Sequence, residues 1–115
     1  MAFDRRPFDV RGERREGGLV VAASGEIDLW TAPRVTTALS EYEGPDGALV
    51  LDLRAVTFMD SSGLGLIVEA QRRARQRSFR FAVAVDGASD VHRILEISGM
   101  AQVIEIVDDP DTVLT

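Results

Sequence analysis

One stretch, residues 48–77, reads ALVLDLRAVTFMDSSGLGLIVEAQRRARQR and decides the fold of this chain. It begins with a nearly continuous apolar run of strand length, as expected for a strand at the centre of a sheet that is covered on both faces. It ends with a helical pattern over residues 62–77, in which apolar side chains fall along one side. That side carries Gly63, Leu66, Ile67, Ala70 and Ala74, and the opposite side carries Ser62, Glu69 and Arg73.

Strand and helix patterns alternate on both sides of this stretch. Near the N-terminus, two short β-prone segments are joined by RREGG, whose paired glycines tolerate the positive φ angle that a turn demands. A helix is expected next, because Thr31 can act as its N-cap and Pro33 suits its first turn. The predicted strands are residues 8–13, 19–24, 48–53, 79–85 and 102–107, and the predicted helices are residues 31–42, 62–77 and 89–99.

The predicted order of elements is β-β-α-β-α-β-α-β. Strands that alternate with helices require crossover connections, so the strands after the first hairpin should pair in parallel. The acidic tail from residue 108 fits a terminal helical turn. We therefore predict a single α/β domain over residues 1–115, with a mixed, mostly parallel sheet, an N-terminal antiparallel hairpin and helices packed on the sheet.

Composition excludes several classes of function. Cysteine is absent, which excludes disulfides, thiol catalysis and cysteine metal sites and favours a cytoplasmic location. No apolar run reaches the length of a membrane helix. The formal net charge of -6 argues against direct binding to nucleic acid, because a basic surface supplies most of that affinity. We expect a protein partner, and neither a cofactor nor a metal ion.

The segment Asp60-Ser61-Ser62 lies between the central strand and the following helix. Short oxygen side chains at this place can cap the free amide groups of the first helical turn, which is a purely structural interpretation. The carboxyl end of a strand is also where open α/β sheets place ligands. Gly63 and Gly65 weaken the helix, and we expect close packing to explain Gly63 and the approach of another backbone to explain Gly65.

A serine hydrolase is a third interpretation of this segment. The elbow motif G-x-S-x-G is not matched, because no glycine stands two positions before Ser61. His92 is the single histidine and lies on a predicted helix, whereas a catalytic triad needs a histidine held by a second acid and an oxyanion hole. The segment GLG also lacks the third glycine of a nucleotide-binding fingerprint. The residues around Ser61 therefore argue against a serine hydrolase.

Three motifs occur in order along the chain: GEIDLWTAP at residues 25–33, FMDSSGLG at 58–65 and HRILEISGM at 92–100. Together they resemble the STAS domain of bacterial anti-sigma factor antagonists, over about residues 8 to 107. The resemblance implies a regulatory protein that is not an enzyme. Such a protein binds an anti-sigma factor, which is itself a serine kinase, and so frees a sigma factor. It also implies that phosphorylation of Ser61 switches binding off, with Asp60, Ser62 and Gly63 flanking the phosphorylation site.

The same resemblance implies partners and a surface for them. The kinase uses ATP, a serine phosphatase reverses the reaction, and neither nucleic acid nor a membrane is contacted. We expect the partner-binding surface to consist of Glu26, Ile27, Asp28, Gly65, Val68, Glu69 and Arg72. Val68 has edge-of-core packing as an alternative role, and Trp30 is either a hydrophobic staple at the start of its helix or an exposed interface anchor. The alternative function is a STAS-fold module of a transport or signalling assembly, in which Ser61 only caps the helix.

Overall fold

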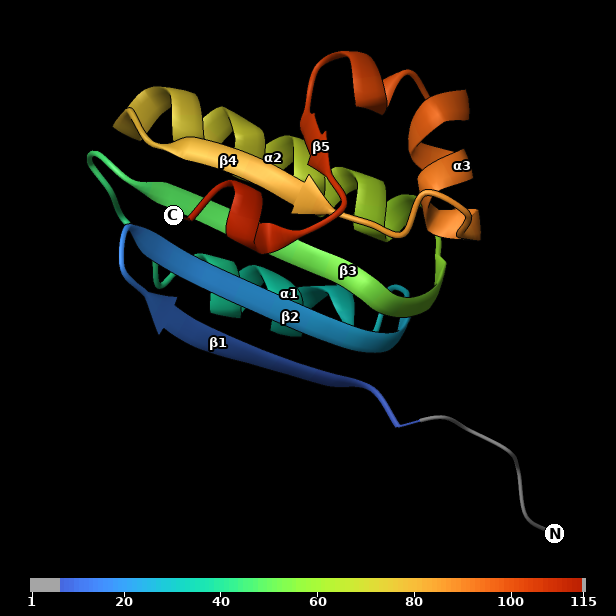
Figure 1. Cartoon of the computed structure of the whole chain (residues 1–115). Coiled ribbons are helices and arrows are strands. Elements are labelled where there is room, and N and C mark those ends of the chain that lie inside the picture. The colour runs from blue at the N-terminus through green and yellow to red at the C-terminus, as the bar shows by residue number, and fades with distance from the viewer. Residues whose placement is uncertain (1–6, 115) are drawn as a thin grey trace, which may run out of the picture.

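The elements follow the predicted order in the computed structural model, which describes residues 7–114 (Figure 1). The strands are β1 (Asp9–Arg15), β2 (Gly18–Ile27), β3 (Ala48–Met59), β4 (Arg80–Ala84) and β5 (Glu105–Val107). The helices are α1 (Ala32–Leu39), α2 (Ser61–Arg77) and α3 (Asp90–Ile97), with short 3-10 helices η1 (Met100–Gln102) and η2 (Pro110–Thr112). The predicted domain also includes residues 1–6 and 115, which lie outside the described range.

The five strands form one sheet in the order β1-β2-β3-β4-β5. β1 pairs antiparallel with β2, and the three other pairings are parallel. Each parallel pair is joined by a crossover that contains one of the three helices, and the helices cover the same face of the sheet (Figure 1). The prediction of a mixed, mostly parallel sheet with an N-terminal hairpin is therefore confirmed.

The main core lies between the sheet and its helices. Leu49, Leu51 and Leu53 alternate along β3 and point into it, and all three are buried. Val50 belongs instead to a smaller cluster on the opposite face. Because β3 is covered on both faces, its apolar residues run almost without interruption, as the sequence predicts.

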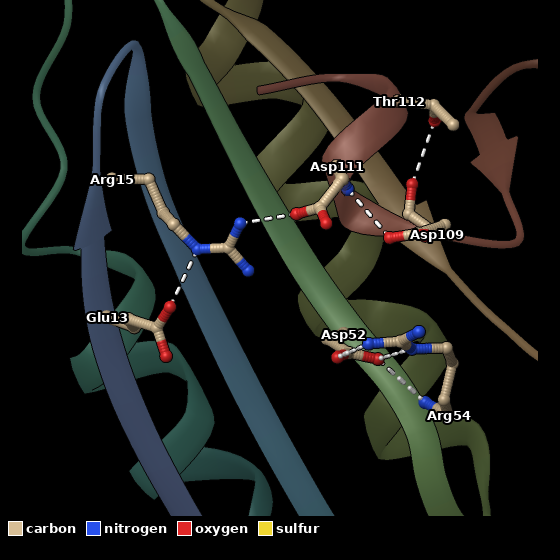
Figure 2. Close-up of polar contacts among 7 residues, drawn as sticks. All are labelled: Glu13, Arg15, Asp52, Arg54, Asp109, Asp111 and Thr112. Atoms are coloured by element: carbon tan, nitrogen blue, oxygen red, sulfur yellow. Dashed lines mark hydrogen bonds and ion pairs between the residues drawn. The ribbon is translucent and has the colours of Figure 1, made fainter. Parts of the chain in front are cut away.

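None of α1, α2 and α3 covers that opposite face of the sheet. The segment after η2 lies over it instead, where Val113 and Leu114 pack against β2, β3 and β4 (Figure 1). Polar pairs surround this small cluster: Arg54 bonds Asp52, and Arg15 bonds both Glu13 and Asp111 (Figure 2). The acidic tail thus forms its predicted helical turn, η2, and covers the face of the sheet that carries no helix.

The boundary of α1 differs from the prediction, since the helix ends at Leu39 and not at Tyr42. A side chain from α2 bonds the backbone carbonyl groups at the end of this helix. The guanidinium of Arg73 donates hydrogen bonds to the backbone carbonyl oxygens of Leu39, at 2.6 Å, and of Tyr42. Arg73 is half-buried and also lies over the ring of Phe79, although its place in the helix is opposite the apolar side.

All five strands differ in length from the prediction, and the differences are largest in β2, β3 and β5. β2 and β3 continue to Ile27 and Met59, through two register shifts in their pairing. These irregularities keep the buried residues Val56 and Met59 directed into the core although the alternation of the sequence breaks there. β5 is shorter than predicted and starts at Glu105, because η1 occupies the residues before it.

Candidate functional site

The ends of β2 and β3 lie next to each other at one edge of the sheet. The backbone amide of Asp60 donates a hydrogen bond of 3.1 Å to the carbonyl oxygen of Ile27. This bond joins the loop before α1 to the start of α2. Two segments that are about 30 residues apart in the chain therefore form one continuous surface, at the carboxyl ends of parallel strands where open α/β sheets bind ligands.

The first turn of α2 is capped by Asp60. Its backbone is extended, and its Oδ1 accepts a hydrogen bond of 2.8 Å from the amide of Ser62. Ser61 is the first helical residue and is exposed, whereas Ser62 is half-buried. Within residues 7–114, neither serine hydroxyl has a hydrogen-bond partner. Capping therefore accounts for Asp60 but leaves both hydroxyl groups unexplained.

The loop before α1 is fixed by hydrogen bonds between Asp28 and Thr31. Oδ1 of Asp28 accepts hydrogen bonds from the amides of Trp30, at 2.9 Å, and Thr31, at 3.0 Å. The hydroxyl of Thr31 accepts one from the amide of Asp28 and donates one to the carbonyl oxygen of Glu26. The hydrogen bonds that the Asp28 carboxyl group accepts, above all those from Thr31, lower its pKa.

Thr31 stands at the N-cap position of α1, as predicted, but its side chain does not cap this helix. Its hydroxyl group is directed back to the loop that precedes the helix. The physical reason is that the Asp28 carboxylate already accepts hydrogen bonds from the loop amides, including that of Thr31. The Thr31 hydroxyl in turn accepts a hydrogen bond from the amide of Asp28, within the same turn.

This fixed loop holds two large apolar side chains in solvent. Leu29 is 69% exposed and Trp30 is 83% exposed. Leu29 also lines an open groove of about 500 Å³ between α1 and α2, next to Ser62. The other residues that line the groove are Ala32, Pro33, Thr36, Thr37 and Leu66. An apolar groove beside an exposed aromatic residue is typical of a surface that binds another protein.

Most of the predicted partner-binding residues lie at the protein surface, and Val68 and Arg72 line a second groove, on the side of α2 that faces η1. Glu26, Gly65, Val68, Glu69 and Arg72 are exposed, and Asp28 is half-buried. Glu69 forms an ion pair with Arg72, which lowers the pKa of the Glu69 carboxyl group. Val68 is 49% exposed, which favours its surface role over edge-of-core packing.

Ile27 is the exception, because its side chain is fully buried. It lies beneath the site, close to Gly63 and within the main core. Including Ile27 among the residues that contact a partner was therefore wrong, because β2 extends through it and turns its side chain inward. Its side chain anchors the start of the loop before α1 in the main core.

Leu29 is the residue at this site that the sequence reasoning missed. The signal for it was available, since two large apolar residues stand together between Asp28 and Thr31, outside any helical or strand period. The structure also decides between the two interpretations of Trp30. Trp30 is exposed, as expected of an interface anchor, whereas a hydrophobic staple would pack against the helix.

The contacts of His92 give no support to a hydrolase. His92 is half-buried on α3, and its Nδ1 lies 3.3 Å from Oε1 of Glu96 on the same helix. Within residues 7–114, no group of three or more histidine and acidic side chains is arranged to hold a metal ion. In the same range, none of the helices is long and apolar enough to cross a membrane.

Comparison with known proteins gives consistent results. The family model for the STAS domain matches residues 9–113. The chain is similar to the anti-sigma-B factor antagonist of Listeria monocytogenes, with 40% identity over 96 residues that cover 82% of each protein. It is 35% identical to the anti-sigma F factor antagonist of Paenibacillus polymyxa, over 94% of this chain and 93% of the relative. The crystal structure of an anti-sigma factor antagonist from Mycobacterium paratuberculosis superposes with a TM-score of 0.79 at 27% identity, over 94% of this chain and 92% of the other.

Proposed function

This chain belongs to the STAS domain family, and on that premise we propose that it is an anti-sigma factor antagonist. In this function it binds an anti-sigma factor and thereby frees a sigma factor for transcription. One observation carries the proposal: Ser62, the neighbour of the exposed Ser61, lines an apolar groove together with the exposed Leu29. The names of relatives that match most of the chain support the same function.

The surface fits a protein partner. Leu29 and Trp30 are the anchors, and the groove between α1 and α2 accepts an apolar side chain of the partner. Gly65 leaves open space above α2, so a backbone segment of the partner can approach the helix closely. The polar members of the surface are Glu26, Asp28, Glu69 and Arg72, and Val68 is its exposed apolar member on α2. The protein itself is cytoplasmic and binds neither nucleic acid nor a membrane in this function.

Ser61 is the proposed phosphorylation site. Its hydroxyl group is exposed at the start of α2, and Asp60 already supplies the helix cap. A phosphate on Ser61 would therefore leave the cap in place. The amide groups and dipole at the N-terminus of a helix stabilise a nearby anion by roughly 0.3 to 1 kcal/mol, so the fold should tolerate the modification.

The same phosphate would weaken binding to the partner. It adds a charge of about -1.5 to -2 beside an apolar groove, and this charge must lose its hydration when the partner docks. A penalty of about 4 kcal/mol would weaken association roughly a thousandfold. We propose that the anti-sigma factor is the serine kinase that adds this phosphate, using ATP, and that a serine phosphatase removes it.

The proposal is tested by incubating the purified protein with an anti-sigma factor kinase and ATP, followed by mass spectrometry. We expect one phosphate on Ser61, absent in the Ser61→Ala variant and retained in the matched Ser62→Ala variant. Binding of the unmodified protein and of Ser61→Asp to the same anti-sigma factor is then compared by calorimetry. If the kinase modifies another substrate but neither serine of this chain, the proposed phosphorylation switch is wrong. Ser61 would then be only a structural residue of the first turn of α2.

A further inference from the structure

The outer strand β1 has one free edge. It is the first strand in the sheet order and, within residues 7–114, pairs only with β2. Arg15 and Gly18 close the hairpin across a two-residue turn, and such a closing pair is the hydrogen-bonded one. The backbone groups of the odd-numbered residues of β1 are therefore directed to β2. Those of Val10, Gly12 and Arg14 point away from the sheet, where they can pair with another strand.

The side chains of β1 carry a symmetric pattern of charge about Gly12. Asp9, Arg11, Glu13 and Arg15 all lie on the face of the sheet that carries no helix, because their pairing partners on β2 include Val20, a member of the small cluster on that face. On this face, Arg11 and Glu13 lie one position from Gly12 and Asp9 and Arg15 lie three positions from it, so opposite charges stand at equal distances on the two sides. Arg14 lies on the other face, and its counterpart at the same distance is Val10. An antiparallel copy of this strand would thus present the complementary order of charges.

We propose that β1 pairs antiparallel with β1 of a second copy of this chain, with the two-fold axis at Gly12. In this register, the two Gly12 residues exchange a pair of backbone hydrogen bonds. Arg11 stands opposite Glu13 of the second copy, and Asp9 stands opposite Arg15. The two five-stranded sheets become one continuous sheet, and four cross-strand pairs of opposite charge stabilise it.

The charges of β1 are free to change partners. Arg15 bonds Glu13 at 2.6 Å within the chain and also bonds Asp111 (Figure 2), while Arg11 lies 3.7 Å from Asp9. These are exposed or half-exposed pairs, which contribute little to stability and rearrange at small cost. Charges on an edge strand usually prevent pairing, but they do so only where like charges meet, and this register brings opposite charges together.

The proposed dimer should depend on concentration and leave both partner-binding surfaces free. A pair of seven-residue strands buries an area at the low end of specific protein interfaces, so the dimer should form at high concentration and dissociate on dilution. The two-fold axis directs the carboxyl ends of β3 in the two copies to opposite ends of the joined sheet. A dimer would therefore present Ser61 twice and could bind two anti-sigma factors at once.

The test is sedimentation velocity on the whole chain over a wide range of concentrations. We expect the mass to rise from one chain to two. Gly12→Pro removes the outward amide that the pairing uses but no bond to β2, and should keep the mass of one chain. Gly12→Ala is the matched control, because its β-carbon would meet Leu19 at an ordinary 3.5 Å and its amide is kept. This control should dimerise like the unchanged protein.

Charge exchange makes the test specific for the register. Arg11→Glu and Glu13→Arg each place like charges opposite each other, and each should weaken the dimer by about tenfold or more. Mixed together, the two variants have complementary charges and should form a one-to-one dimer. The proposal is overturned if the unchanged chain keeps the mass of one chain at every concentration, if Gly12→Pro dimerises as well as Gly12→Ala, or if the mixed variants stay apart.

Discussion

Gly63 on α2 lies directly against Met59 at the end of β3. A β-carbon added to Gly63 would stand 2.1 Å from Cγ and 2.4 Å from Sδ of Met59, distances that no packed structure allows. Met59 is itself buried and has little room to move. The missing side chain thus lets the first turn of α2 sit close to the strand that it follows.

Substitution by alanine should therefore have opposite effects at Gly63 and Gly65. Gly63→Ala should lower the free energy of unfolding by about 1 to 3 kcal/mol, as overpacking of a core does. Gly65→Ala is the matched control on the exposed side of the same turn, where nothing lies within 4 Å of an added β-carbon. It should raise stability by about 0.5 to 1 kcal/mol through helix propensity. Urea unfolding measures both, and equal effects at the two positions would contradict the close packing of Gly63.

The cap of α2 depends on the side-chain oxygen of Asp60. Asp60→Ala should reduce the free energy of unfolding by about 1 kcal/mol, because the amide of Ser62 loses its partner. Asp60→Asn keeps an oxygen at the same place and should lose much less. If alanine and asparagine are equally destabilising in urea unfolding, the charge of Asp60 matters and the hydrogen bond does not.

Trp30 should contribute to partner binding without contributing to stability. Trp30→Ala should weaken binding to the anti-sigma factor by about 30-fold or more, the size of effect that defines an interface anchor. Ile97→Ala is the matched control, because Ile97 is 78% exposed but lies at the end of α3, outside the proposed surface. It should bind normally, and both variants should unfold at the same urea concentration as the unchanged protein. Trp30 is the single tryptophan, so its fluorescence also reports the docking directly.

Asp28 should make the stability of the loop depend on acid pH. Its pKa is lowered from 3.8 by the hydrogen bonds from Thr31 and Trp30, so the folded protein favours the ionised form. The stabilisation is fully present above the unfolded value and is lost as pH falls from there through the lower, native value. Asp28→Asn keeps an acceptor that does not titrate. The difference in unfolding free energy between the two proteins should shrink as pH falls below about 4, and a constant difference would exclude Asp28 as the cause.

The order of the elements could be predicted from the sequence because each one shows its own period. The apolar run at residues 48–53 and the helical pattern at 62–77 identify β3 and α2 without ambiguity. The ends of elements were harder. β3 continues through Arg54 and Ala55, where alternation fails, because register shifts and not side-chain pattern keep Met59 inside. Such irregular pairing depends on the neighbouring strand and leaves no local signal.

The candidate site could be predicted only in part for a similar reason. The exposed residues of α2 follow from helical geometry, so Val68, Glu69 and Arg72 were placed on the surface correctly. Ile27 was not, because the length of β2 determines which way its side chain points. Arg73 has the polar character of a surface residue, and only the folded chain shows that the ends of α1 and Tyr42 supply acceptors for its guanidinium.

The contact of Arg73 with the end of α1 has a consequence for recognition. α1 and α2 form the two walls of the groove, and the Arg73 guanidinium joins them by hydrogen bonds to backbone carbonyl oxygens. The groove is thus preorganised, and a partner that enters it spends little binding free energy on ordering the surface. The affinity of the partner would then depend on the residues next to the groove, where we propose that phosphorylation of Ser61 adds a charge.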